Sequence, residues 1–292
     1  MFPLDMPFTC SICACNEART LCFIDQPDRF EQSIGVGTQG YARQWVECFY
    51  CGAASNLLPP ESLQRLATLR AAYYEVDFMG SDIGVKYRRV MSMPAGQSDN
   101  AGRVARVTDF VRRWSGAPAR PRVMDIGAGT GVFLSRLVDQ TAGVWQYLGI
   151  EPDPRAAAHL RQLEKFAVVE AMYLSQPELR GFNLVTLNKV LEHIEQPLPF
   201  LLQVVQSLVS DDGLLYVEVP DKLTTRLRLP QDNILGALHC HLYDPASLGY
   251  VLRRAGLELL CVNRIAEPSG KLSVYAFAAP AESVVKKGLP YE

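Results

Sequence analysis

Three glycines follow an acidic residue in the segment Val-Met-Asp-Ile-Gly-Ala-Gly-Thr-Gly, which covers residues 123–131. The apolar run ends at Asp125, and Gly127, Gly129 and Gly131 then lead into residues with the apolar spacing of a helix. Glycine permits a positive φ and lets a ligand approach the main chain closely. Because an acid and not a phosphate-binding lysine stands here, the segment favours a ligand with cationic and hydroxyl groups over a polyphosphate. We therefore predict a buried parallel strand that turns into a helix at a small-molecule site.

A second strand with an acidic end follows at about the distance expected for a βαβ unit. Residues 147–151, Tyr-Leu-Gly-Ile-Glu, form an apolar run that ends in Glu151. A carboxylate at this position is the usual partner of ribose hydroxyls. Further strands are predicted at residues 182–188 and 213–220, and a terminal antiparallel hairpin at residues 257–264 and 272–279.

Taken together, these motifs resemble class I S-adenosylmethionine-dependent methyltransferases over about residues 121–280. The segment Val-Leu-Glu-His-Ile at residues 190–194 is also similar to the one that follows the fourth strand in this family. The resemblance implies an α/β fold with a Rossmann-like seven-stranded methyltransferase sheet that binds S-adenosyl-L-methionine. The cofactor-binding residues that it implies are Asp125, Gly127, Gly129, Glu151, Pro152, Met172 and Asn188.

Each of the side chains in this set has an expected contact. Asp125 is expected to bind the ammonium group of the cofactor or to orient the glycine turn, and Glu151 to bind both ribose hydroxyls, because a carboxylate offers two acceptors. Pro152 should lie near the adenine edge. Met172 either packs on the adenine ring or belongs to the core, and Asn188 is expected at the methionine carboxylate or amine.

Six of the eight cysteines lie within the first 51 residues. Cys10 and Cys13 form one Cys-x-x-Cys pair, and Cys48 and Cys51 form a second. Two such pairs supply the four thiolates of a closed, tetrahedral zinc site, whereas the alternative is a set of buried free thiols. We predict that these four residues bind a structural Zn²⁺.

Replacement of one zinc ligand by Cys15 or Cys22 is the weaker alternative. A cysteine-rich module ahead of the core is similar to the arrangement of many bacterial sugar methyltransferases. We predict a zinc-binding module at residues 1–60, a helical linker or lid at residues 61–118 and the methyltransferase domain at residues 119–292. Within the linker, the aromatic residues that either cover the cofactor or pack in the core are Tyr73, Tyr74 and Tyr87.

The catalytic candidates are Glu192, His193 and His241. Glu192 and His193 follow the fourth strand at the carboxyl edge of the sheet, where ligands bind in open α/β folds. An imidazole with a pKa near neutrality suits the acceptance of a hydroxyl proton, although the same pair is also a structural feature of many relatives. His239 and His241 point the same way if their segment is extended, as a substrate clamp or a second base. A zinc site there is not expected, because Cys240 would point away and no acid is suitably spaced.

In sugar C-methyltransferases a tyrosine stands two positions before the acid of such a pair, and here that position is Val190. The difference favours O-methylation of a sugar or nucleotide sugar in polysaccharide or natural-product biosynthesis. The alternatives are C-methylation of a keto sugar, methylation of an RNA base, and a non-catalytic cofactor-binding subunit. Residues 1–60 contain six acidic residues and three arginines, which counts against an RNA-binding finger.

Composition agrees with a globular protein that acts on a small molecule. The 292 residues are 48% hydrophobic and 21% charged, with a net charge of −2 that gives no general attraction to nucleic acid. No apolar run approaches the roughly 18 residues of a membrane span, and the first residues lack the features of a signal peptide. We expect a cytoplasmic protein whose cysteines do not form a disulfide framework, and the oligomeric state stays open.

Overall fold

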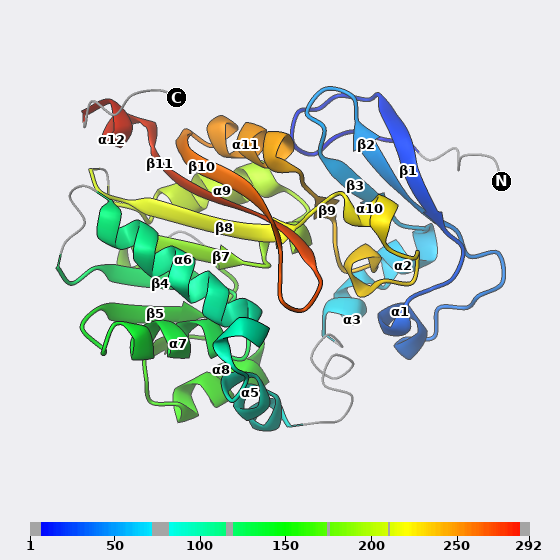
Figure 1. Cartoon of the computed structure of the whole chain (residues 1–292). Helices are drawn as coiled ribbons and strands as arrows, with labels where there is room; N and C mark the ends of the chain where they lie inside the picture. The colour runs from blue at the N-terminus through cyan, green and yellow to red at the C-terminus, as the bar shows by residue number, and fades with distance from the viewer. Residues whose placement is uncertain (1–6, 72–81, 115–118, 174–175, 210, 287–292) are drawn as a thin grey trace.

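The computed structural model describes residues 7–71, 82–114, 119–173, 176–209 and 211–286. Within these ranges the strands form a seven-stranded sheet and a separate four-stranded sheet, which lie side by side in Figure 1. The seven-stranded sheet has the order β10-β11-β8-β7-β4-β5-β6. Its strands are β4 (Arg122–Ile126), β5 (Gln146–Ile150), β6 (Ala167–Val169), β7 (Leu184–Asn188), β8 (Leu214–Pro220), β10 (Leu257–Ala266) and β11 (Leu272–Pro280).

Five neighbouring strands of the large sheet, from β6 to β8, are parallel. Strand β11 is antiparallel both to β8 and to β10, so the chain ends in the hairpin that the sequence predicts. After β4 the chain continues to β5, which pairs with one edge of β4, and the later strand β7 pairs with the opposite edge of β4. Strand order therefore reverses beside β4, and in open α/β sheets ligands bind outside the carboxyl ends of the strands at such a point.

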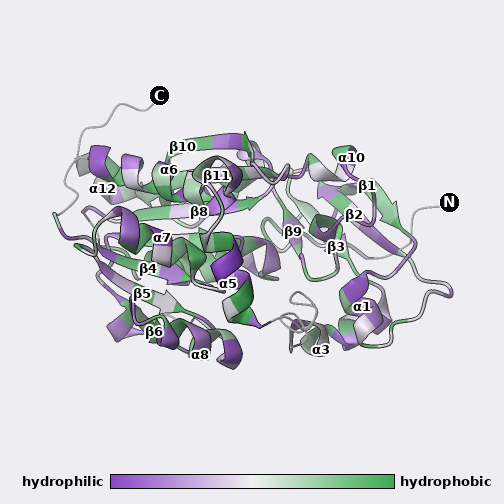
Figure 2. Cartoon of the chain, turned by 60° about the horizontal axis from the view of Figure 1, so that its bottom comes forward, coloured by the Kyte–Doolittle hydropathy of each residue, from purple (hydrophilic) through white to green (hydrophobic). Residues whose placement is uncertain are grey.

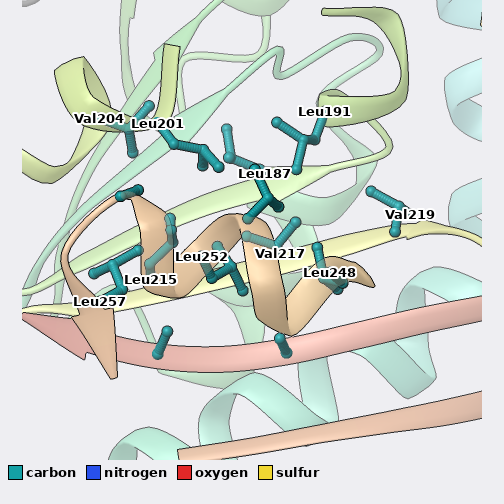
Figure 3. Packing of buried hydrophobic residues seen from close by; sticks show 14 of the residues in the cluster. Leu187, Leu191, Leu201, Val204, Leu215, Val217, Val219, Leu248, Leu252 and Leu257 are labelled. Carbon is teal, nitrogen blue, oxygen red and sulfur yellow. The ribbon is translucent and has the colours of Figure 1, made fainter. Parts of the chain in front are cut away.

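Two layers of helices cover the large sheet because its strands are apolar on both faces. Along β8, Leu214 and Tyr216 pack with one layer, whereas Leu215 and Val217 pack with the other. The first layer contains α6 (Asp99–Arg113), α7 (Val132–Gln140) and α8 (Pro154–Gln162), and the second contains α9 (Pro197–Val205) and α11 (Pro245–Arg254). Figure 3 shows the second layer, where side chains of α9 and α11 meet those of β7 and β8. In Figure 2, α5 and α7 carry both hydrophobic and hydrophilic segments, as expected for helices with one buried face.

The four-stranded sheet has the order β1-β2-β3-β9 and is antiparallel throughout. It consists of β1 (Ala18–Ile24), β2 (Arg43–Cys48), β3 (Ala54–Leu57) and β9 (His241–Leu242). Its core surrounds Trp45, which packs with Leu235 and Leu242 from the far part of the chain. The N-terminal module predicted at residues 1–60 therefore shares its sheet with a strand from the predicted methyltransferase domain.

The remaining helices are short. They are α1 (Arg29–Ser33), α2 (Pro60–Gln64), α3 (Leu66–Ala71), α5 (Ile83–Met91), α10 (Thr224–Leu227), α12 (Ala281–Lys286) and the 3₁₀ turns η1 (Ala95–Gln97), η2 (Pro177–Leu179), η3 (Leu191–His193) and η4 (Asn233–Leu235). In the described ranges, every helix is too short or too polar to cross a lipid bilayer. Of the lid candidates, Tyr73 and Tyr74 lie outside the described residues, and the ring of Tyr87 contacts His159 with centroids 5.4 Å apart.

Candidate active site

The glycine turn lies between β4 and α7, at the point where strand order reverses. Gly127, Gly129 and Gly131 all have positive φ values, of +74°, +56° and +77°. A Cβ atom on Gly127 would lie 2.7 Å from a methyl group of Val190, and one on Gly131 would lie 2.5 Å from a methyl group of Leu160. Both positions thus require glycine for backbone conformation and for space, as the sequence predicts for a turn that a ligand approaches.

Asp125 is buried behind this turn and bonds to the neighbouring strand. Its Oδ1 accepts hydrogen bonds from Thr186 Oγ1 at 2.5 Å and from Asn188 Nδ2 at 2.7 Å. Burial raises the pKa of Asp125 to about 7, although these two hydrogen bonds oppose the increase. The Asn188 Oδ1 atom is buried and has no hydrogen-bond partner among the described residues. A carboxylate and an unpaired amide oxygen so placed fit a cationic ligand group.

Glu151 follows β5 directly and is also buried. Its Oε2 accepts a hydrogen bond from Gly129 N at 2.7 Å, and its Oε1 accepts one from Asp153 N at 3.0 Å. Because a carboxylate oxygen can accept more than one hydrogen bond, the geometry is compatible with the predicted contact to ribose. Pro152 is exposed beside it, and the side chain of Met172 is 69% exposed. The alternative that Met172 belongs to the core is therefore wrong.

Glu192 and His193 lie in η3, directly beyond β7, and the structure adds His239 to them. The rings of His193 and His239 meet edge to face with centroids 4.6 Å apart. Burial raises the pKa of Glu192 to about 7 and lowers the pKa of His193. Burial and the nearby His193 lower the pKa of His239 to about 3. Both imidazoles are thus neutral at physiological pH and able to accept a proton or bind a cation.

His241 contacts both the N-terminal module and the segment after η3. Its Nε2 lies 3.2 Å from Ser11 Oγ and 3.3 Å from Glu195 O, and its Nδ1 lies 3.4 Å from Ser55 Oγ. His239 and His241 have different partners. His239 N donates a turn hydrogen bond to Gly236 O, and the ring of His239 meets the ring of His193. The structure therefore brings Glu192 and His193 together with His239, and places His241 in β9, which pairs with β3 of the module.

An acid that is distant in the sequence lies close to His239, whereas His241 is not part of this group. A potential ligand atom of Glu192, one of His193 and one of His239 lie within 4.8 Å of one another. The acid comes from η3, far from His239 in the sequence, and Cys240 N donates a hydrogen bond to Glu192 O at 2.6 Å. Spacing within the histidine segment alone could not reveal this partner.

A network of buried charges beneath the site is absent from the predictions. Arg103 and Arg106 of α6 both pair with Glu218 of β8, the second at 2.7 Å, and Lys189 lies 3.3 Å from the same carboxylate. Burial acts to raise the pKa of Glu218, but Arg103 and Lys189 outweigh it and hold the pKa well below its ordinary value. Lys189 directly follows Asn188 and has a positive φ of +60°. The ion pairs hold α6 against the carboxyl ends of β7 and β8.

The four predicted metal-binding cysteines form one cluster. Cys10 Sγ lies 3.6 Å from Cys51 Sγ, Cys13 Sγ lies 3.5 Å from Cys48 Sγ, and all four sulfur atoms are within 4.8 Å of one another. A tetrahedral zinc ion with Zn–S bonds of about 2.3 Å separates its sulfur ligands by about 3.8 Å. The cluster therefore fits zinc. Two further predicted alternatives, Cys15 and Cys22, lie outside it among the described residues.

Comparison with known proteins identifies the family of the chain and structures of similar fold. A family model described as a methyltransferase domain matches residues 98–262. No curated protein sequence matches the chain significantly. Among solved structures, the chain is similar to the Burkholderia thailandensis 1,6-didemethyltoxoflavin-N1-methyltransferase with bound 1,6-didemethyltoxoflavin and S-adenosylhomocysteine, at 17% identity and a TM-score of 0.55, over 82% of this chain and 95% of that one. It is also similar to the plantazolicin methyltransferase BpumL in complex with a pentazolic desmethylPZN analogue and S-adenosylhomocysteine, at 13% identity and a TM-score of 0.53, over 76% of this chain and 99% of that one. At these identities the likeness concerns the fold.

Proposed function

Because this chain belongs to the methyltransferase-domain family, whose model matches more than half of it, we propose that it O-methylates a sugar or nucleotide sugar. S-adenosylmethionine, when bound, supplies a methyl group on a sulfonium, which a nucleophilic oxygen can attack. The residues proposed to hold it are Asp125 and Asn188 at the methionine end, Gly127 and Gly129 at the turn, Glu151 at the ribose, and Pro152 and Met172 near the adenine.

The observation that carries the acceptor chemistry is the group formed by Glu192, His193 and His239 at the carboxyl edge of β7. Val190, two positions before Glu192, packs against Gly127 of the glycine turn, so the group follows the cofactor-binding edge directly. A hydroxyl acceptor loses its proton as its oxygen bonds to the methyl carbon. We assign acceptance of that proton to the Glu192–His193 pair, in which burial lowers the pKa of His193 and keeps its imidazole neutral and able to take a proton.

Support for a sugar acceptor comes from the predicted zinc module and from Val190 in place of the tyrosine of C-methylating relatives. The acidic balance of residues 1–60 disfavours RNA. Both similar structures contain a bound organic compound, 1,6-didemethyltoxoflavin in one and a desmethylPZN analogue in the other, in line with a small-molecule substrate. We propose no step for His241, whose ring nitrogens contact the hydroxyl groups of Ser11 and Ser55 in the module and the backbone oxygen of Glu195.

The test is release of S-adenosylhomocysteine by enzyme purified without chelator, measured with pools of nucleotide sugars, free glycosides and bulk RNA. Turnover with a sugar pool, lost in Glu192→Gln and in His193→Ala while S-adenosylhomocysteine still binds, is the expected result. Turnover with RNA alone would overturn the acceptor and keep the fold. Unchanged turnover in both variants would overturn the assignment of the base.

A further inference from the structure

Glu192, His193 and His239 have the composition of an open metal site. Two of them come from η3 and the third from the loop before β9, and a potential ligand atom of each lies within 4.8 Å of those of the others. Two imidazoles and one carboxylate form a common catalytic zinc set, which leaves at least one coordination position for water or substrate. With a metal–ligand distance of about 2.0–2.1 Å, the ligand atoms of a tetrahedral ion are about 3.3 Å apart. Small side-chain rotations would therefore close the three groups around an ion.

The hydrogen bonds of the two imidazoles fix which nitrogen can bind a metal. His193 Nδ1 lies 2.9 Å from Leu238 O, and His239 Nδ1 lies 2.7 Å from Ile234 O. A carbonyl oxygen only accepts, so each Nδ1 carries the proton and each neutral ring keeps its lone pair on Nε2. Metal-binding histidines typically donate their other ring nitrogen to a backbone carbonyl or a carboxylate in this way.

Glu192 supplies an independent observation that points to a ligand. The residue is 1% exposed, and its Oε2 has no hydrogen-bond partner among the described residues. A buried carboxylate oxygen without a partner is costly. The bond from Cys240 N to Glu192 O joins the two segments and so keeps the carboxylate beside the histidine loop.

From these three observations we propose that Glu192, His193 and His239 bind a divalent transition-metal ion of the Zn²⁺ type. This second metal site is separate from the cysteine cluster. The cysteine cluster offers four sulfur ligands and is closed, whereas the second site offers two nitrogen atoms and one oxygen atom and is open.

The consequence for catalysis rests on the proposed function. An ion in the open site would bind the acceptor hydroxyl and lower its pKa, so that its proton leaves to water. The acceptor oxygen then forms a bond to the methyl carbon as the sulfonium C–S bond breaks, and that electron pair stays on sulfur as S-adenosylhomocysteine leaves. With the ion bound, His193 Nε2 is a ligand, so water takes the proton that the Glu192–His193 pair accepts directly when the site is empty.

The site is tested by metal content of the full chain, which does not depend on turnover or on the identity of the acceptor. The protein is loaded with excess Zn²⁺, desalted and analysed for zinc per chain. We expect two ions in the wild type, one in His239→Ala and one in Glu192→Gln. His159→Ala, which removes a histidine of α8, is the matched control and should keep two. The near-isosteric Glu192→Gln gives the answer if His239→Ala does not fold, as judged by circular dichroism.

Cobalt substitution identifies the ligands of each ion. The first equivalent of Co²⁺ should produce the thiolate-to-metal charge-transfer band of the cysteine site, and the second should add only ligand-field absorption. A single ion in the wild type, two ions in Glu192→Gln and His239→Ala alike, or a second equivalent that adds thiolate bands would each overturn the site. The site can be confirmed even if no sugar is methylated, and sugar methylation can be confirmed if the wild type binds one ion.

Discussion

Asp125 and Glu151 are both buried acids at strand ends, but their hydrogen bonds differ. Asp125 accepts bonds from the side chains of Thr186 and Asn188, whereas Glu151 accepts bonds from the backbone amides of Gly129 and Asp153. Glu151 therefore holds the glycine turn through Gly129 and is also predicted to bind the ligand. Asp125 lies behind the turn and contacts the neighbouring strand instead. Both acids were predictable from their positions after apolar runs. Thr186 was not singled out, although it points to the same side of β7 as Asn188, two residues later.

Substitution of Glu151 by alanine should weaken cofactor binding. The change removes a charged acceptor at the ribose and one hydrogen bond that holds Gly129. Hydrogen bonds to a charged group contribute about 1.5–3 kcal/mol each, so the affinity for S-adenosylhomocysteine should fall by about 10- to 100-fold. Calorimetric titration measures this. Glu170→Ala, which removes an exposed acid paired with Arg161 at 2.8 Å, should leave the affinity unchanged. Equal affinities in the two variants would contradict the ribose contact.

The stability of the cofactor-free protein should depend on pH through Asp125. Its pKa is about 7 in the folded chain against an ordinary value of 3.8, so the folded state holds the proton to higher pH. The stabilisation from this group is complete below pH 3.8 and is lost as the pH rises through about 7. Relative to Asp125→Asn, the wild type should lose on the order of 2–3 kcal/mol of unfolding free energy between pH 5 and pH 8. Urea denaturation at both pH values measures it, and parallel profiles for the two proteins would refute the raised pKa.

At the scale of elements, the sequence predicts those helices and strands that have a local signal, but it does not predict which distant segments pair with one another. The glycine turn, β4, β5, β7, β8 and the terminal hairpin each have a signal within a few residues, and the structure has all of them. Strand β9 contains only His241 and Leu242. It exists because β3 offers an edge for pairing, which no pattern within two residues can indicate. The same limit hid the proximity of Glu192 to His239.

Alanine at Gly127 should destabilise the turn through two separable effects. A side chain at a φ of +74° costs about 1–2 kcal/mol, and the new methyl group would also press on Val190. Gly143→Ala is the matched control, because Gly143 has a φ of +68° and a Cβ atom added there would meet no other atom within 4 Å. We expect Gly127→Ala to lose about 1–3 kcal/mol more than Gly143→Ala in urea denaturation. Equal losses of unfolding free energy in the two variants would mean that Val190 moves away from the new methyl group without an energetic cost.

At the scale of the whole molecule, the N-terminal module and the large sheet are joined by polar contacts around one loop. Lys222 Nζ donates to Glu47 in the module at 2.6 Å and pairs with Asp244 at 2.7 Å. Asn56 of β3 donates to His239 O at 2.9 Å. The module thus holds the loop that places His239 beside His193. The sequence predicted a module with a structural metal, but its contact with the active-site loop depends on the assembled fold.

Loss of the cysteine-bound metal should therefore impair turnover more than cofactor binding. Cys48→Ser removes one of the four ligands, and a structural zinc site contributes directly to folding free energy. We expect one zinc fewer per chain, a Tm lower by several degrees and a fall in kcat of at least about tenfold, because β3 no longer fixes the His239 loop. The Kd for S-adenosylhomocysteine should change by less than about twofold, since Asp125 and Glu151 belong to the other sheet.

Cys261→Ser provides the control for this experiment, because Cys261 lies in β10 outside the cluster. It should keep the zinc content, the Tm and the kcat of the wild type. A Cys48→Ser protein with full zinc content would contradict the assignment of the ligands. Equal losses of kcat and cofactor affinity would contradict the separation of the two sheets.

The strand order β1-β2-β3-β9 also constrains how the chain folds during synthesis. All four cysteines of the cluster have left the ribosome soon after residue 51, so the metal can bind while most of the protein is still untranslated. The edge of β3, however, stays unpaired until residues 241 and 242 emerge. During that interval the nascent module exposes a strand edge that can pair with other chains. Early metal binding orders the cysteine end of the module but leaves this edge open. In zinc-starved cells the module also lacks its metal, so more of the protein should accumulate in inclusion bodies.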